Sequence, residues 1–263
     1  MTRDAWSPDC YDRFRAERTQ PFENLLALVR HAPEMRVVDL GCGTAELTRR
    51  VHETLAARET LAIDSSDAML ERARMHEGAG LRVERGNISD FRAHAEFDLV
   101  FSNAALHWVP GHDELFRRLA EALTPEGQLA VQLPANFDHP SHTVATAVAA
   151  EEPFRTALDG GRHRDDVVLA PEAYASLLHR LGFRAQHVRL QVYAHELEAS
   201  AEVVEWVRAS LLTSYQRRLP PDVFDRFAAR YRERLLAELG EVRPYLFTFK
   251  RLLLWADRRA ALA

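Results

Sequence analysis

Short apolar runs alternate with segments of helical periodicity through the first half of the chain. The runs predict strands at 36–40, 60–63, 81–85, 97–101 and 128–133. Between the first two runs, Leu47, Val51 and Leu55 share one face of a helix expected over 44–57. Regular alternation of strands and helices predicts a parallel sheet flanked by helices.

The pattern changes after residue 133. Two long apolar strands are expected at 183–194 and 245–255, and helices broken at Pro220-Pro221 fill most of the sequence between them. We therefore expect the sheet to finish with two late strands and the helices to form a cap or lid. The predicted division is 1–135, the core with an N-terminal lid helix over 9–31, and 136–263, the cap with the last two strands.

The turn after the first strand is the strongest candidate site. Asp39 ends an apolar strand, and Gly41 and Gly43 permit a tight turn and a close backbone approach before the next helix. Ligands of parallel sheets bind beyond the carboxyl ends of strands, where the strand order reverses. A Gly-x-Gly pair alone is weak evidence, because a plain strand-to-helix turn has the same sequence.

Acidic neighbours narrow the choice of ligand. A dinucleotide site places a third glycine and a pyrophosphate where this chain has Glu46, which argues against a nicotinamide-dependent oxidoreductase. Asp39 adds a second negative charge, whereas Asp64, at the end of the second strand, suits the two hydroxyl groups of a ribose. A nucleoside that carries a cation and no phosphate describes S-adenosylmethionine.

These residues resemble the class I methyltransferases that use S-adenosylmethionine, over residues 36–133. The resemblance implies a Rossmann-like, seven-stranded, mostly parallel sheet. It implies that Asn87-Ile88 flanks the adenine, although Asn87 replaces the usual acid and Ala45 replaces a common glycine. The cofactor-binding residues would be Arg18, Asp39, Gly41, Gly43, Asp64, Ser65, Met69, Asn87, Ile88, Asn103 and Ala104.

Longer strings are similar to the trans-aconitate methyltransferase family. They include 14–21, 101–112, 130–136, 140–142 and 205–207. This resemblance implies formation of a methyl ester on one carboxylate of a small polycarboxylic acid, with His107 and Trp108 at the transfer pocket. Because the other carboxylates need cations, Arg15, Arg162 and Arg251 are candidate substrate-binding residues. A carboxyl methyltransferase acting on a malonyl carrier protein and a non-catalytic cofactor-binding module remain alternatives.

The composition of the chain limits its possible binding partners and its cellular compartment. The net charge of −5 disfavours a broad nucleic-acid surface, and no stretch has the length and apolarity of a membrane span. Two cysteines, Cys10 and Cys42, favour a reducing cytoplasm. No metal is expected, since Pro140 separates His139 from His142 and no third ligand is evident. We expect a monomer or weak dimer that acts on a small molecule.

Overall fold

The computed structural model describes residues 15–158, 167–208 and 211–259, without the side chains of 15–18. The chain divides into two compact units. The larger consists of 18–134, 167–191 and 251–263, and the smaller of 1–17, 135–166 and 192–250. The sequence-based boundary at residue 135 stays a prediction.

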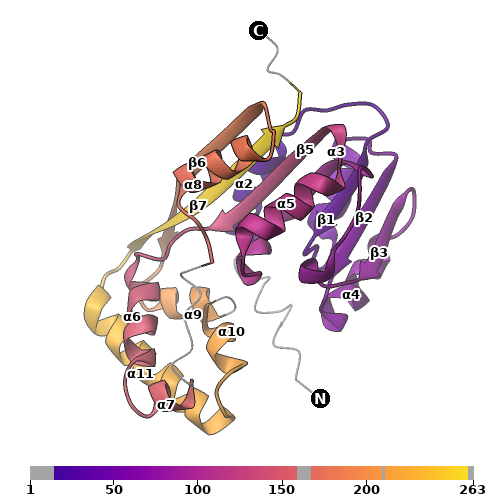
Figure 1. The fold of residues 1–263 in the computed structure, drawn as a ribbon. Coiled ribbons are helices and arrows are strands. Elements are labelled where there is room, and N and C mark those ends of the chain that lie inside the picture. Colours follow the sequence, from indigo (N-terminus) through magenta and orange to yellow (C-terminus); the bar gives the residue numbers. More distant parts are fainter. Residues whose placement is uncertain (1–14, 159–166, 209–210, 260–263) are drawn as a thin grey trace. The chain divides into compact units, whose positions relative to one another are not determined.

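One sheet of seven strands has the order β3-β2-β1-β4-β5-β7-β6 (Figure 1). Strands β1 to β5 pair in parallel, whereas β7 runs antiparallel to β5. This sheet confirms the predicted fold class. The strands are β1 (Arg36–Leu40), β2 (Glu59–Asp64), β3 (Leu81–Arg85), β4 (Phe97–Asn103), β5 (Leu123–Pro134), β6 (Ala185–Leu197) and β7 (Tyr245–Asp257).

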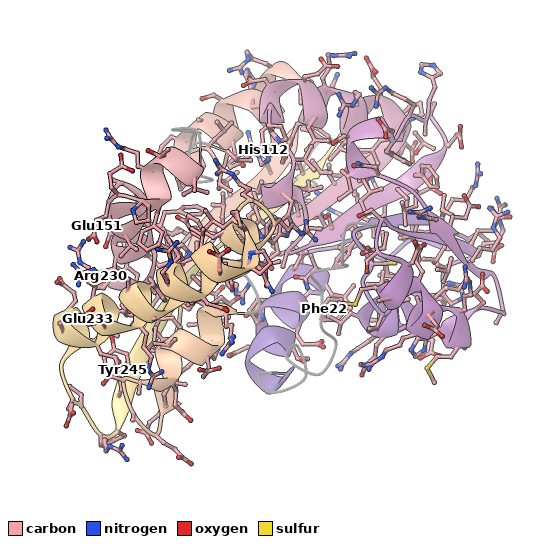
Figure 2. The ribbon with its side chains drawn as sticks, turned by 90° about the horizontal axis from the view of Figure 1, so that it is seen from below. Phe22, His112, Glu151, Arg230, Glu233 and Tyr245 are labelled. Carbon is pink, nitrogen blue, oxygen red and sulfur yellow. The ribbon has the colours of Figure 1, made fainter. Side chains whose placement is uncertain are left out.

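Helices cover both faces of the sheet in the larger unit. Figure 1 shows α5 and α8 on the near face and α2 behind the sheet. On the α2 face, the rings of Phe22 (labelled in Figure 2) and Phe101 meet edge to face at 5.8 Å, in a core that includes Val37, Val51 and Leu99. The helices are α2 (Arg15–Leu26), α3 (Glu46–Thr54), α4 (Asp67–Ala73), α5 (His112–Ala122) and α8 (Pro171–Arg180), with short 3₁₀ turns η1 (Arg74–His76), η2 (Ile88–Asp90) and η3 (Leu106–Trp108).

Two of the predicted boundaries that differ from the structure have a clear physical reason. The helix expected over 9–31 ends at Leu26, and tight turns follow it before Pro33, which disfavours helix in the preceding residue. The turn expected at 124–127 lies inside β5. Leu123 pairs with Phe97 and Gln128 with Leu99, so the four residues between them bulge out of the ladder.

The smaller unit has an aromatic core. Trp206, Phe227 and Phe247 are buried, and Tyr231 donates a hydrogen bond to the Ser141 carbonyl at 2.9 Å. Its helices are α6 (Pro140–Ala149), α7 (Phe154–Ala157), α9 (Glu202–Arg208), α10 (Leu211–Gln216) and α11 (Pro221–Leu239).

Ion pairs join two of these helices at the surface. Glu151, at the end of α6, contacts Arg230 at 3.0 Å and Arg234 at 2.5 Å, and Arg230 also contacts Glu233 (Figure 2). Exposed pairs of this kind contribute about 0–1 kcal/mol each. None of the described helices is long and apolar enough to cross a membrane.

Candidate active site

The turn after β1 is built by two glycines with different surroundings. The backbone N–H groups of Gly41 and Cys42 donate to the Ile63 carbonyl at 2.8 and 3.0 Å, which holds the turn against β2. A Cβ atom on Gly41 would lie 2.2 Å from the Ala105 Cβ. A Cβ on Gly43 would have no described atom within 4 Å. The backbone is therefore packed at Gly41 and open at Gly43, where a ligand can approach.

Asp39 is a buried carboxyl group at the end of β1. Its Oδ2 accepts a hydrogen bond from the Thr48 hydroxyl at 2.5 Å, whereas Oδ1 has no hydrogen-bond partner among the described residues. Burial raises the pKa of Asp39 to about 7, the Thr48 hydrogen bond lowers it, and the charge of Asp64 raises it. A ligand cation would favour the ionised form of this carboxyl group.

Asp64 organises the turn as well as its own strand end. Its Oδ2 accepts from the Gly43 N–H and its Oδ1 from the Ser66 N–H, both at 2.9 Å. Each carboxylate oxygen has further acceptor capacity, so these contacts leave room for two hydroxyl donors. The ribose-binding role expected for Asp64 stays a prediction.

We expect Asp64→Ala to weaken cofactor binding by roughly 1–3 kcal/mol, because ribose hydroxyl groups would lose their acceptors and the Gly43 N–H its partner. Calorimetric titration with S-adenosylhomocysteine measures this loss. Glu59→Ala, an exposed carboxylate on the same strand, serves as the control. An unchanged affinity in Asp64→Ala would remove Asp64 from the site.

The predicted adenine side lies at the ends of β2 and β3. Ser65 is exposed, and the neighbouring Ser66 caps α4 by accepting from the Met69 N–H at 3.3 Å. Asn87 caps η2, with its Oδ1 accepting from the Ser89 N–H at 2.9 Å. Its amide NH₂ and the second lone pair of Oδ1 remain available for a base. Met69 is buried on α4, and Ile88 is half-buried.

The end of β4 carries a second buried acceptor. The Oδ1 atom of Asn103 is buried without a hydrogen-bond partner in the described ranges. Ala104 follows with a left-handed φ of 55° and donates its N–H to the Gln132 carbonyl at 3.0 Å. The Ser102 hydroxyl donates to the Leu40 carbonyl at 2.7 Å and ties β4 to the end of β1. Left-handed backbone at a non-glycine residue is strained, and such strain concentrates at functional sites.

The 3₁₀ turn η3 presents His107 and Trp108 just beyond Asn103. Their ring centroids lie 5.1 Å apart, and His107 is buried. His112 fixes this turn from α5: its Nε2 lies 3.1 Å from the Leu106 carbonyl, and its Nδ1 lies 2.5 Å from the Tyr174 hydroxyl. Burial lowers the pKa of His112, which favours a neutral ring. Sequence reasoning missed this support because Tyr174 is 62 residues away.

The surroundings of Cys42 disfavour a nucleophilic role. Burial, followed by the charges of Asp39 and Asp64, raises the pKa of its thiol, so the reactive thiolate is disfavoured. The cysteine is free and lies in the turn between the two glycines. Burial is the main cause, and the acidic groups that suit a cationic ligand add to it.

Only one of the candidate substrate arginines has a described side chain. Arg251, on β7, is buried, and its Nη1 donates to the Gln132 Oε1 at 3.5 Å. Arg162 and the side chains of Arg15 and Arg18 lie outside the described residues. The contact of Gln132 with Arg251 was missed, although Gln132 is a polar residue near the carboxyl end of an apolar strand.

Metal-binding groups do not gather in the part of the chain that the structure describes. No cluster of three or more His, Cys, Asp or Glu side chains occurs there. His139 and His142, the pair considered from sequence, both lie 3.0 Å from the Ser141 hydroxyl through their Nδ1 atoms. These two rings are therefore engaged in a hydrogen-bond chain.

Comparisons with known proteins agree with this site. A family model described as a methyltransferase domain matches residues 37–127. The fold resembles that of the YcgJ protein from Bacillus subtilis, with a TM-score of 0.58 at 13% identity, covering 92% of this chain and 100% of that one. An S-adenosylmethionine-dependent methyltransferase from Mesorhizobium loti is 25% identical, with a TM-score of 0.50 and coverages of 90% and 96%. The fold and the site thus define a methyltransferase.

Full-length relatives narrow the class. A trans-aconitate 2-methyltransferase from Deinococcus radiodurans is 41% identical over 258 residues, covering 96% of this chain and 98% of the relative. One from Mycobacterium tuberculosis is 34% identical over 259 residues, covering 96% of both chains. The chain belongs to the trans-aconitate 2-methyltransferase family.

Proposed function

We propose that this protein is an S-adenosylmethionine-dependent O-methyltransferase that forms a methyl ester on a carboxylate of a small polycarboxylic acid. Trans-aconitate is the first candidate acceptor, because relatives named for that acid align along nearly the whole chain. The observation that carries the proposal is a pair of buried acceptors, Asp39 Oδ1 and Asn103 Oδ1, each without a hydrogen-bond partner within the described residues. They lie near the carboxyl ends of neighbouring strands, where a cation would satisfy both.

The residues present fit the cofactor. Asp39 and Asn103 would face its positive groups, the open backbone at Gly43 would lie against it, and Asp64 would hold the ribose hydroxyls. Ile88 and Met69 offer apolar surface and Asn87 a polar edge for the adenine. When bound, S-adenosylmethionine supplies an electrophilic methyl group on a sulfonium.

The acceptor needs little chemical activation. Carboxylic acids with pKa values near 4 are ionised at pH 7, so no general base has to remove a proton. What remains is to hold one carboxylate oxygen about 3 Å from the methyl carbon, in line with the breaking bond, and to exclude water. His107 and Trp108 would wall the transfer pocket, and the guanidinium of Arg251 would hold a second carboxylate of the acid.

Incubation with methyl-labelled S-adenosylmethionine and a panel of di- and tricarboxylic acids tests the proposal. We expect base-labile label in trans-aconitate, as a methyl ester requires. Label found only on a malonyl carrier protein would replace the small acid by a carrier-bound one. Cofactor binding without transfer to any acceptor would support the non-catalytic module and overturn the proposal.

A further inference from the structure

Four polar side chains lie on one face of four adjacent strands, β1, β4, β5 and β7. In the sheet register Asp39 is opposite Phe101, and Asn103, two residues further along β4, is opposite Gln132. Arg251 is opposite Pro134, two residues beyond Gln132. Because residues i and i+2 of a strand share a face, Asp39, Asn103, Gln132 and Arg251 all project toward the same side of the sheet.

The row changes from acceptors to donors along its length. The unsatisfied atoms of Asp39 and Asn103 are oxygens, whereas the unsatisfied atom of Gln132 is its buried Nε2. The orientation of the Gln132 amide follows from its neighbour: a guanidinium can only donate, so the oxygen must face Arg251 and the NH₂ group must point elsewhere. The β5–β7 end of the row therefore favours an anion.

The other glutamine on this strand, Gln128, has no unsatisfied NH₂ group of the kind found at Gln132. Gln128 lies on the same face four residues earlier, and both polar atoms of its amide are hydrogen-bonded. Its Oε1 accepts from the Arg30 N–H at 2.8 Å and the Trp255 Nε1–H at 3.0 Å, and its Nε2 donates to the Arg30 carbonyl at 2.8 Å. Gln132 is 0% exposed, yet its Nε2 has no hydrogen-bond partner in the described part of the chain. A buried donor in this state destabilises the free protein, and a ligand acceptor would satisfy it.

We propose that Gln132 is a specificity-determining residue, whose NH₂ group joins the Arg251 guanidinium in binding one carboxylate of the acceptor acid; this rests on the proposed methyltransferase function. Charge-assisted hydrogen bonds withdraw electron density from the carboxylate they hold, so that group serves as an anchor. The methyl group must then go to a different carboxylate of the same molecule. The subsite therefore selects acids with at least two carboxylates and leaves one of them unmethylated.

Gln132→Met tests the subsite, with Gln128→Met as its matched control. Methionine keeps the length of glutamine and removes both polar atoms. We expect Gln132→Met to raise KM for trans-aconitate roughly tenfold or more, because the NH₂ group that binds the acid is lost. Thermal stability should change little, because the long 3.5 Å contact to Arg251 and the unsatisfied NH₂ group are removed together. The affinity for S-adenosylhomocysteine should stay unchanged. Gln128→Met should show the opposite pattern, a lowered melting temperature and an unchanged KM, because three good hydrogen bonds are lost.

A second comparison uses the charge and number of carboxylates. Gln132→Glu keeps an acceptor for Arg251 but places an anion at the subsite, so KM for trans-aconitate should rise further than in Gln132→Met. The preference of the wild-type protein for trans-aconitate over the monocarboxylic acid crotonate, measured as a ratio of kcat/KM, should shrink in both Gln132 variants. It should be retained in Gln128→Met.

The outcomes separate this inference from the proposed function. The affinity for trans-aconitate can be measured without turnover, by calorimetric titration of protein saturated with S-adenosylhomocysteine. Wild-type transfer with unchanged KM and acid affinity in Gln132→Met would overturn the subsite alone. If Gln132→Met weakens S-adenosylhomocysteine binding and leaves KM for trans-aconitate unchanged, the Gln132 amide binds the cofactor's own carboxylate. That result would also overturn the proposed subsite. A wild-type protein that neither methylates nor binds any acid would overturn both.

Discussion

Asp39→Asn is expected to stabilise the ligand-free protein at pH 8 by at most about 4 kcal/mol and to weaken cofactor binding at the same time. The wild-type carboxyl group has a pKa of about 7 against an ordinary value of 3.8, mainly because it is buried. That difference corresponds to about 4 kcal/mol of destabilisation once the group is ionised in the folded protein. Asparagine removes the charge and can still accept the Thr48 hydroxyl.

The pH dependence of stability gives the sign of this effect. Between pH 4 and 7, roughly, the folded protein keeps the Asp39 proton and the unfolded chain has lost it. The contribution of Asp39 to stability is therefore fullest below its unfolded pKa, falls as the pH rises through this window and levels off above the folded pKa of about 7. Urea unfolding at a series of pH values should show this fall in the wild-type protein and a flatter profile in Asp39→Asn.

Ligand binding should respond in the opposite direction. A sulfonium beside Asp39 favours the ionised form, so binding below pH 7 should release a proton, and affinity should rise with pH up to that point. In Asp39→Asn we expect S-adenosylmethionine to bind about 3 kcal/mol more weakly. S-adenosylhomocysteine, which lacks the sulfonium charge, should lose much less affinity.

Asp98→Asn is a matched control for both measurements. Asp98 lies on β4 and accepts from the Arg36 N–H at 2.9 Å and the Thr124 hydroxyl at 3.0 Å, so its role is structural. We expect this variant to lose stability and keep its cofactor affinity. Equal losses of affinity for S-adenosylmethionine and S-adenosylhomocysteine in Asp39→Asn would contradict a sulfonium beside Asp39.

The parts of the candidate site that are local in sequence were predictable. The end of β1, Gly41, Gly43 and the acid at the end of β2 occur in one short stretch, where apolar runs mark the strands and the turn chemistry is explicit. Asn103 was predicted through the family resemblance, and it is the last residue of the apolar β4. These positions need no knowledge of tertiary packing, whereas the hydrogen bond from the Gly43 N–H to Asp64 is a contact that the structure adds.

Contacts between distant residues were not predictable. Thr48 reaches Asp39 from the first turns of α3, Tyr174 supports η3 through His112, and Arg251 reaches Gln132 over 119 residues. A sequence pattern gives the face of a strand, but the neighbouring strand and its register decide which side chains meet. The sequence indicated two late strands, and only their order in the sheet puts Arg251 on β7 beside β5.

Gly41→Ala and Gly43→Ala form the second pair of variants with a large expected contrast. Both glycines have left-handed φ values, 83° and 58°, so alanine should cost about 1 kcal/mol of backbone strain at either position. At Gly41 the added methyl group would also collide with the Ala105 Cβ at 2.2 Å, just before η3. We expect the free energy of unfolding of Gly41→Ala to fall by about 3 kcal/mol in total, because overpacking in a closed site adds to the backbone strain.

At Gly43 the added methyl group would meet no described atom within 4 Å, so the free energy of unfolding should fall by only the strain, about 1 kcal/mol. Cofactor affinity should fall instead, because the methyl group would occupy the open side of the turn. Urea unfolding and calorimetric titration with S-adenosylhomocysteine, applied to both variants, separate the two effects. Equal losses of stability would contradict the close packing of the β1 turn against Ala105. An unchanged affinity in Gly43→Ala would place the ligand away from this turn.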